Sequence, residues 1–151
     1  MIRVRRMEAK DAGAAARLEA ENFSRPWSEQ AFLDTLSCEY AYYYVAETEA
    51  EGLVIGLCGL RSLAGEGEIT NVAVQESFRR KGVAGMLLDA VLAKGRELGI
   101  QAFTLEVRRG NNPAIRLYQK YGFRGEGVRR DFYEKPKEDA LIMWKRQGMS
   151  K

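Results

Sequence analysis

The sequence has 151 residues, enough for one domain with a hydrophobic core, and 46% of its residues are hydrophobic. Its 24 basic and 21 acidic residues leave a formal net charge of +3, which does not favour a nucleic-acid-binding protein. Histidine is absent, which excludes histidine-based catalytic triads and most zinc sites. Any general base must therefore be a carboxylate, a tyrosine, a lysine or a relayed water.

The N-terminal residues 1–6 are charged and lack a following apolar signal segment, and no apolar run reaches the roughly 18–20 residues that span a bilayer. We therefore expect a cytoplasmic protein without membrane association. Cys38 and Cys58 do not form a metal-binding spacing, so no metal is expected. In a reducing compartment a disulfide is disfavoured, and Cys58 is expected in the core.

The chain begins with the pattern of a short strand followed by a helix. Residues 2–5 predict the strand, and Asp11 is expected to cap a helix that runs to about Asn22. The narrow apolar stripe of this helix consists of Ala14, Ala15 and Leu18.

A second helix is predicted directly after a proline. Pro26 interrupts the helical conformation, and Ser28 is a favourable N-cap for the next helix. Trp27 precedes that cap and is expected to pack on Phe32 as a hydrophobic staple. The apolar side chains of this helix are Phe32, Leu33 and Leu36.

Three strands follow. Residues 40–47 and 53–63 predict a hairpin, and residues 66–75 predict a third long strand. The aromatic run at residues 40–44 suggests a base-stacking platform, but it lacks interleaved lysine or arginine. Aromatic residues on a strand pack against helices more often, so we expect no direct contact with nucleic acid.

A short basic loop with a glycine joins the strand ending at Val74 to a long amphipathic helix that Gly99 terminates. The start of a helix offers unpaired N–H groups and the positive end of the helix dipole. Gly82 lets the main chain approach a ligand closely, and Arg79, Arg80 and Lys81 flank it. The loop therefore predicts a site for a diphosphate, although neither GxxxxGK[ST] nor GxGxxG occurs.

The last third of the chain predicts a strand, a helix and two strands. Residues 102–108 alternate, with Glu106 on the polar face, and Asn112 and Pro113 start a helix ending at Gly122. Residues 123–130 and 138–146 predict the final strands, joined by residues 131–137. The order β-α-α-β-β-β-α-β-α-β-β predicts an α+β domain with a mixed sheet.

Glu106 and Tyr118 suit acyl transfer from a thioester to an amine. Glu106, directly or through water, can remove the proton from the amine, and the Tyr118 phenol can protonate the leaving thiolate. A backbone N–H near Val74 can bind the oxyanion if the strand bulges there. Taken singly, each residue has an ordinary reading: Glu106 as a surface residue paired with Arg108, and Tyr118 as a core residue.

The spacing of Arg79, Gly82 and Ala84 resembles the R/Q-x-x-G-x-G/A loop of the GNAT acetyltransferase superfamily. The pattern LEVRxxNxxAxxLYxxxGF over residues 105–123 resembles its ribosomal-protein alanine N-acetyltransferases. Residues 26–28 (PWS), 71–74 (NVAV) and 129–133 (RRDFY) are similar to segments of the same branch. Phe132 departs from the family pattern RRxYY because it lacks the first of two tyrosine hydroxyls.

This resemblance implies the GNAT fold, an α/β/α-layered, mostly antiparallel twisted sheet with four flanking helices, as a single domain over residues 1–151. It implies acetyl-CoA as cosubstrate, Glu106 as general base and Tyr118 as general acid. The implied acetyl-CoA contacts are Val72, Ala73, Val74, Arg79, Arg80, Lys81, Gly82, Val83, Ala84, Gly85 and Asn111. Pro26, Trp27 and Tyr133 are candidates for the acceptor pocket, although they serve equally well as packing residues.

The implied acceptor is the N-terminal α-amine of a small-subunit ribosomal protein, typically at alanine, and the implied assembly is a monomer or weak dimer. The alternatives are an acetyltransferase acting on a polyamine, an aminoglycoside or a lysine side chain, and a non-catalytic module that binds acyl-CoA. An acidic acceptor cleft would favour a polycationic small amine. The presence of both Glu106 and Tyr118 argues against the non-catalytic module.

Overall fold

The computed structural model describes residues 1–146, which form a seven-stranded sheet with the order β1-β2-β3-β4-β5-β7-β6. The strands are β1 (Ile2–Arg6), β2 (Ala41–Thr48), β3 (Val54–Leu63), β4 (Glu66–Val74), β5 (Ala102–Arg108), β6 (Arg124–Tyr133) and β7 (Glu138–Arg146). The helices are α1 (Ala12–Asn22), α2 (Glu29–Leu36), α3 (Val83–Glu97) and α4 (Asn112–Lys120), with short 3-10 turns η1 (Ala9–Asp11) and η2 (Glu76–Phe78).

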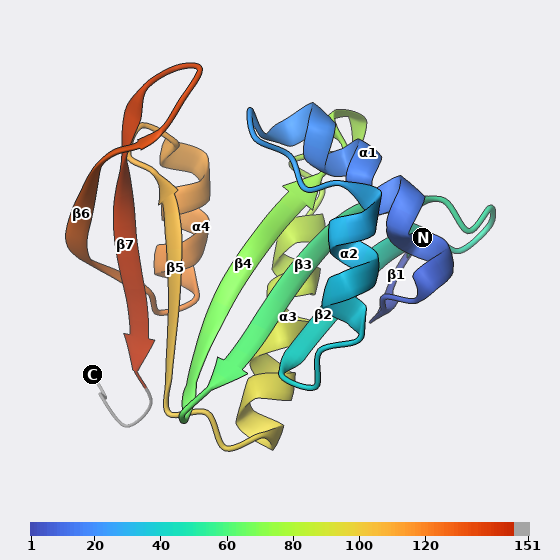
Figure 1. Cartoon of the computed structure of the whole chain (residues 1–151), viewed down its shortest axis with the longest axis horizontal. Coiled ribbons are helices and arrows are strands. Elements are labelled where there is room, and N and C mark those ends of the chain that lie inside the picture. Colours follow the sequence, from blue (N-terminus) through green and yellow to red (C-terminus); the bar gives the residue numbers. More distant parts are fainter. Residues whose placement is uncertain (147–151) are drawn as a thin grey trace.

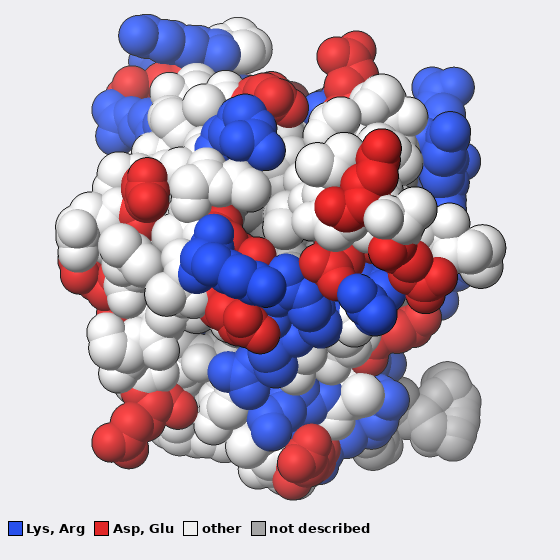
Figure 2. All heavy atoms as spheres, turned by 90° about the vertical axis from the view of Figure 1, so that its right-hand side faces the viewer, with Lys and Arg blue, Asp and Glu red and all other residues white. Residues whose placement is uncertain are grey.

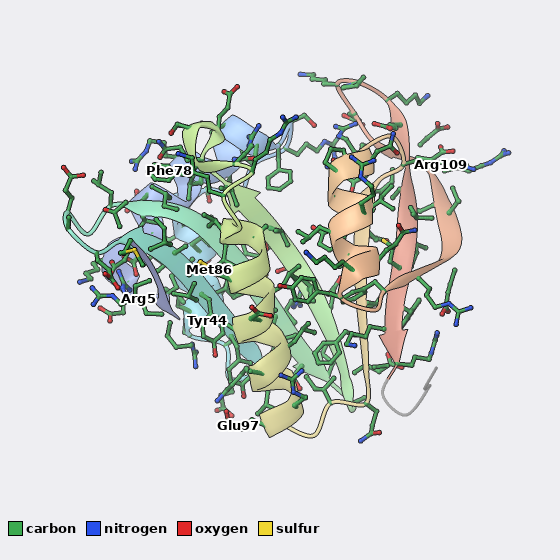
Figure 3. All side chains as sticks on the ribbon, turned by 180° about the vertical axis from the view of Figure 1, so that it is seen from behind. Arg5, Tyr44, Phe78, Met86, Glu97 and Arg109 are labelled. Carbon is green, nitrogen blue, oxygen red and sulfur yellow. The ribbon has the colours of Figure 1, made fainter. Side chains whose placement is uncertain are left out.

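The helices cover the sheet in pairs. Helices α1 and α2 lie on one face, over the first strands, and α3 and α4 lie on the other (Figure 1). Seen from behind, α3 and α4 run side by side along the sheet (Figure 3). All sheet neighbours are antiparallel except β4 and β5. The predicted element order and the layered α+β architecture are therefore confirmed, and none of the helices in residues 1–146 is long and apolar enough to cross a membrane.

Two predicted helix signals act as expected. The Ser28 hydroxyl accepts a hydrogen bond from the Ala31 N–H at 3.0 Å, and the rings of Trp27 and Phe32 lie 5.2 Å apart. Asp11 is the N-cap residue of α1, and the helix ends at Asn22, as predicted, but the Asp11 side chain makes no capping hydrogen bond to it. Its carboxylate accepts from the Glu8 N–H at 2.8 Å and from Arg5, so it closes the η1 turn and does not cap α1 with its side chain.

The final hairpin is tighter than predicted. Strand β6 continues through Tyr133, so only residues 134–137 connect it to β7, where residues 131–137 were expected. Register shifts lie between Gly125 and Gly127 and between Arg129 and Tyr133. Because β6 contains these irregular positions, residues 131–133, which the sequence pattern assigns to a loop, belong to the strand.

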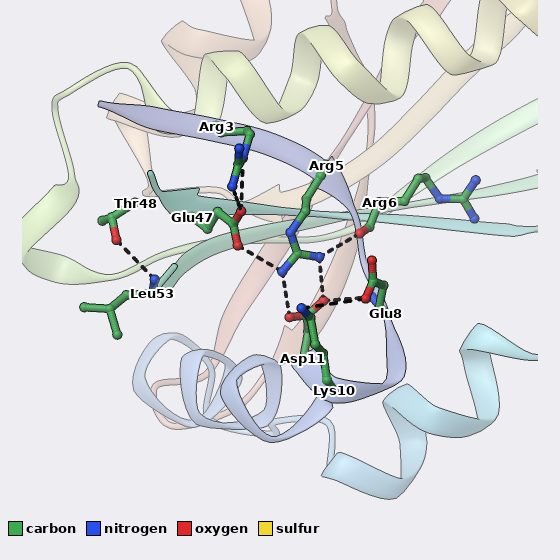
Figure 4. A network of polar contacts seen from close by, with 9 residues as sticks. All are labelled: Arg3, Arg5, Arg6, Glu8, Lys10, Asp11, Glu47, Thr48 and Leu53. Carbon is green, nitrogen blue, oxygen red and sulfur yellow. Dashed lines mark hydrogen bonds and ion pairs between the residues drawn. The ribbon is translucent and has the colours of Figure 1, made fainter. Parts of the chain in front are cut away.

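An ion-pair network joins β1 to the start of α1 and the end of β2 (Figure 4). The Arg5 guanidinium contacts Asp11 at 2.9 Å and Glu47 at 3.0 Å, and Arg3 contacts Glu47 at 2.7 Å. The network borders a hollow of about 480 Å³ that Lys10 and Arg17 also line. Basic side chains gather on this side of the molecule with acidic ones among them (Figure 2).

The network predicts an acid-dependent loss of stability. Hydrogen bonds from Arg5 and Arg3 lower the pKa of Glu47 to about 2. Because the folded pKa lies below the unfolded value of about 4.3, this stabilisation is complete above about pH 4.3 and is lost as the pH falls toward 2. Urea unfolding at pH 6 and pH 3 should show a larger loss for the wild type than for Glu47→Gln. Equal losses would contradict this role for Glu47.

Gly95 allows α3 to pack closely on the sheet. A Cβ there would lie 2.3 Å from the Phe103 ring, whereas a Cβ at Gly13 of α1 would meet Glu29 at 3.8 Å. We therefore expect Gly95→Ala to destabilise the fold by about 1–3 kcal/mol through overpacking. Gly13→Ala should stabilise it by about 0.5–1 kcal/mol, the usual helical gain. Thermal unfolding of both variants tests the contrast, and a shared sign would refute it.

Candidate active site

The two parallel strands at the centre of the sheet pair only at one end. Residues Glu66, Gly67 and Glu68 of β4 lie opposite Ala102, Phe103 and Thr104 of β5, and the ladder then stops. From there the strands diverge toward the end of β4 (Figure 1). The segment Val72–Val74 pairs with β3 on one side, and within residues 1–146 no strand pairs with its other edge. Apart from the Val74 carbonyl, which accepts from Arg79, its main-chain groups on that edge are therefore open to a ligand.

The basic loop adopts a conformation that exposes its amide groups. Arg80 and Gly82 have φ values of +63° and +81°, so two residues of this short loop are in the left-handed region. Met86 is the first residue of α3 with a bonded N–H, to the Gly82 carbonyl at 3.1 Å, and no side chain caps the helix. The N–H groups of Val83, Ala84 and Gly85 have no acceptor among the described residues, which is the arrangement that can bind an anion at a helix start.

The side chains of the loop have different surroundings. The Arg79 guanidinium donates to the Val74 carbonyl at 3.1 Å and to Asn22 at 2.8 Å, so it ties the loop to β4 and α1. Lys81 lies 5.8 Å from the ring centre of Phe78, which Figure 3 shows beside the start of α3. Arg80 is exposed and has no ion-pair partner in residues 1–146. Arg80 and Lys81 are thus the two cations of the loop that can turn toward a bound anion.

Helix α4 packs against the start of α3. The Tyr121 hydroxyl donates to the Gly85 carbonyl at 3.0 Å, and a Cβ on Gly85 would lie 2.9 Å from that hydroxyl. Asn111, a predicted acetyl-CoA contact, is the N-cap of α4, where its side chain accepts from the Ala114 N–H at 3.3 Å. Its amide N–H groups have no acceptor among the described residues, so a ligand can use them.

Glu106 lies on the polar face of β5, as its alternation predicts, but its partner is not Arg108. Arg129 of β6 donates to Glu106 Oε2 from Nε at 2.7 Å, and its Nη2 lies 2.6 Å from the same oxygen. Arg108 instead contacts Glu138 at 3.3 Å. The bulge at Glu126 explains this geometry: it shifts the register so that Arg129 shares the face of Glu106.

Tyr118 is almost fully buried, and its ring packs edge-on against Phe123 at 6.1 Å. Its hydroxyl has no hydrogen-bond partner in residues 1–146, and the residue is 6% exposed. Burial raises the pKa of Tyr118, with smaller contributions from Cys58 and Tyr133, which keeps the phenol protonated.

Tyr133 lies within electrostatic range of the other two candidate residues, Glu106 and Tyr118. Burial and then the negative charge of Glu106 raise the pKa of Tyr133 to about 12. The Arg108 guanidinium lies 4.5 Å from the centre of its ring. The negative charge of Glu106 thus affects the pKa of Tyr133, and Tyr133 in turn contributes to the raised pKa of Tyr118.

The loop between α1 and α2 meets the β6–β7 turn across the open end of the sheet. The Ser24 hydroxyl donates to the Glu134 carbonyl at 2.7 Å, and Arg25 pairs with the Glu134 carboxylate at 2.7 Å. Pro26 of the same loop is exposed, whereas Trp27 faces inward, with its ring 5.9 Å from that of Tyr43. The main contacts of Trp27 are therefore those of a packing residue, with Phe32 and Tyr43, as the alternative to an acceptor-pocket role predicted.

A buried polar network next to this loop was not predicted. Glu19 is only 1% exposed, and its carboxylate accepts from the Trp27 N–H at 3.0 Å and from Asn71 at 2.9 Å. Asn71 accepts in turn from the Tyr43 hydroxyl at 3.0 Å. The available signal was an acidic residue on the apolar stripe of α1, four positions after the buried Ala15.

The bulge expected near Val74 lies earlier in β4. The register shifts between Cys58 and Leu60, so that Thr70 and Asn71 oppose a single residue, whereas Val74 pairs regularly with Gly56. The condition of a bulge at Val74, under which a nearby N–H was expected to bind the oxyanion, is therefore not met. The Val74 carbonyl is held by Arg79, and the open main-chain groups of this segment result from the separation of β4 and β5.

Comparison with known proteins identifies the family and the fold of this chain. The family model described as Acetyltransferase (GNAT) family matches residues 13–123. A Bacillus subtilis protein provisionally named [ribosomal protein bS18]-alanine N-acetyltransferase is 34% identical over 142 residues, 93% of each chain. The ribosomal-protein-S18-alanine N-acetyltransferase structure from Escherichia coli superposes with a TM-score of 0.88 at 27% identity, covering 100% of this chain and 97% of that one.

A third similar protein is Ard1 from Thermoplasma volcanium, whose structure gives a TM-score of 0.85 at 30% identity and covers 96% of this chain and 97% of its own. The match thus extends over both halves of the sheet, including the separated strands and the basic loop. Together with the family match over most of the chain, it establishes the GNAT fold. The chain belongs to the acetyltransferase (GNAT) family.

Proposed function

We propose that this protein transfers the acetyl group of acetyl-CoA to the α-amine of a protein N-terminus, with an N-terminal alanine of a small-subunit ribosomal protein as acceptor. The observation that carries the proposal is the open helix start at Gly82, which adjoins the separated strands β4 and β5. The names of the Bacillus and Escherichia relatives support the choice of acceptor. The proposal treats residues 1–151 as a single domain. Because the acceptor is a ribosomal protein, the proposal also places the reaction in the cytoplasm.

The loop before α3 fits a diphosphate. Its unpaired N–H groups converge at the positive end of the α3 dipole, and a Cβ on Gly82 would meet nothing within 4 Å, so the approach to the main chain is open. Arg80 and Lys81 add positive charge to this position. In the proposed complex, Arg79 acts by fixing the loop to β4.

The edge of Val72–Val74 fits the amide-containing arm of coenzyme A. An extended chain with amide groups can add to an open strand edge by main-chain hydrogen bonds. This edge leads from the basic loop toward β5, which carries Glu106, and Tyr118 lies on α4, the next helix along the chain. A coenzyme held at both points would present its thioester between the two strands, and the Asn111 amide would be available beside α4.

Glu106 and Tyr118 supply the proton transfers in this proposal. Glu106 Oε1 has no partner among the described residues, so it can accept the amine proton directly or through one water. The buried Tyr118 phenol, kept protonated by its raised pKa, can donate a hydrogen bond to the departing sulfur. Tyr133, whose pKa is raised partly by the charge of Glu106, is the candidate contact for the acceptor.

Proton removal favours an α-amine over a lysine side chain. An α-amine with a pKa of about 8 needs only about 1.4 kcal/mol for deprotonation at pH 7. A lysine with a pKa of about 10.4 needs about 4–5 kcal/mol. A single carboxylate can therefore deprotonate an α-amine more easily than a lysine side chain.

The contacts of Ser24 and Arg25 with Glu134 link the loop between α1 and α2 to the β6–β7 turn. In the proposed complex they narrow the path by which the acceptor enters from the open end of the sheet.

The acceptor can be identified by thiol release from acetyl-CoA with three amines. These are a peptide beginning with alanine, the same peptide blocked at its N-terminus but containing lysine, and spermidine. The proposal predicts turnover with the free N-terminus only. Turnover of spermidine alone would identify a small-amine acetyltransferase, and tight acetyl-CoA binding without any turnover would identify a non-catalytic module.

The diphosphate site makes a prediction for Arg80 and Lys81. Replacing both residues by alanine should raise the KM for acetyl-CoA about tenfold or more, because two cations next to the phosphates are lost, while kcat changes little. Lys135→Ala and Lys137→Ala, in the β6–β7 turn, together form a control with the same change in net charge. Steady-state kinetics with acetyl-CoA as the varied substrate measures the effect, and an unchanged KM would refute the assignment.

A further inference from the structure

The contact between Arg129 and Glu106 raises a question about how the acceptor reaches its base. Two guanidinium nitrogens of Arg129 lie within 2.7 Å of Glu106 Oε2, and Oε1 has no partner among the described residues. In the free enzyme, therefore, the carboxylate assigned as general base already holds a cation. An N-terminal amine arrives mainly as an ammonium ion, which is attracted to the same carboxylate.

The ion pair between Arg129 and Glu106 can open at little cost in free energy. The Arg129 and Glu106 side chains are 56% and 23% exposed, and exposed ion pairs contribute little to stability. Arg129 also has a second contact. Its guanidinium lies 5.1 Å from the centre of the Phe132 ring, which is itself exposed. A cation over an aromatic face is stabilised by the ring quadrupole, so Phe132 can retain Arg129 when the carboxylate is taken by another cation.

We propose that Arg129 is a positioning residue that holds Glu106 in the free enzyme and that the acceptor ammonium displaces it, leaving Arg129 on the Phe132 ring. This inference rests on the proposed function, because it requires an amine acceptor at Glu106. Its consequence is that Arg129 competes with the acceptor. Removing Arg129 should strengthen acceptor binding even though it removes a native contact of the general base.

Steady-state kinetics at saturating acetyl-CoA, with the alanine peptide as the varied substrate, tests this competition. For Arg129→Gln we expect the acceptor KM to fall about threefold to fivefold. Arg129→Lys keeps a cation next to Glu106 and should stay within about twofold of the wild type. Arg130→Gln is the matched control, because Arg130 is an exposed neighbour with no ion-pair partner in residues 1–146. Its KM should not change.

A binding measurement shows whether the effect acts through Glu106. Calorimetry of the alanine peptide with CoA-loaded protein should give a lower Kd for Arg129→Gln than for the wild type. In a Glu106→Gln background the same substitution should leave Kd unchanged, because there is no carboxylate left to compete for. Thermal unfolding of each variant confirms that the comparison is made between folded proteins.

Three results would overturn the inference. One is an Arg129→Gln variant whose acceptor KM is unchanged or higher. Another is an equal fall in KM for Arg129→Lys, and the third is an equal change in Kd with and without Glu106. These results are distinct from failure of the proposed function, which would appear as a wild-type protein that acetylates no N-terminal amine.

Discussion

Glu106→Gln should lower kcat about 100-fold or more, because glutamine cannot accept the proton that the amine must lose. The KM for acetyl-CoA should stay within about twofold, since Glu106 lies on β5, away from the basic loop. The substitution conserves the shape of the side chain, and the one ion pair that Glu106 makes within residues 1–146 is with Arg129, whose side chain is 56% exposed. Thiol release under saturating acceptor and acetyl-CoA measures the loss.

Glu68→Gln is the control for this variant. Glu68 is an exposed carboxylate on β4 at the last residue paired with β5, so the same chemical change occurs on a neighbouring strand. Its kcat should equal that of the wild type. A Glu106→Gln variant that retains the wild-type rate would exclude Glu106 as the base, whether it acts directly or through water.

Tyr118→Phe should also lower kcat about 100-fold, because the hydroxyl is the proton donor to the leaving sulfur. The ring should remain packed on Phe123, and the hydroxyl has no hydrogen-bond partner within the described residues. Stability should therefore change by less than about 0.5 kcal/mol. A large kinetic loss with an unchanged melting temperature would separate a chemical role from a packing role.

Tyr40→Phe provides the matched control, because Tyr40 is an exposed phenol at the opposite half of the sheet. Both substitutions remove one hydroxyl, and only the one at Tyr118 should slow the reaction. Equal rates for Tyr118→Phe and the wild type would contradict the role as general acid. The ordinary interpretation, a core tyrosine packed on Phe123, would then be sufficient.

Local signals predicted most of the fold. Ser28 caps α2, Gly99 adopts a φ of +78° after α3, and the alternation in β5 buries Phe103, Leu105 and Val107 while leaving Glu106 on the polar face. Each of these outcomes depends on residues within about four positions, where hydrogen-bonding capacity and side-chain period decide the structure. Asp11 takes the N-cap position of α1, but its carboxylate is occupied by Arg5 and by the Glu8 N–H.

The errors and omissions at the site have non-local causes. The divergence of β4 and β5 depends on how two strands separated by a helix lie in the sheet, and no local pattern encodes where their ladder stops. The partner of Glu106 was missed because the bulge at Glu126 changes the face on which Arg129 lies. The glycines on either side of Glu126 were the only local hint of that bulge.

A structure of the protein crystallised with acetyl-CoA tests the central claim most directly. We expect the diphosphate within hydrogen-bond distance of the N–H groups at the start of α3, with the extended arm along Val72–Val74. The acetyl group should lie between Glu106 and Tyr118. A diphosphate bound elsewhere, for example in the hollow lined by Arg3 and Arg17, or no binding of the coenzyme in solution, would contradict the account.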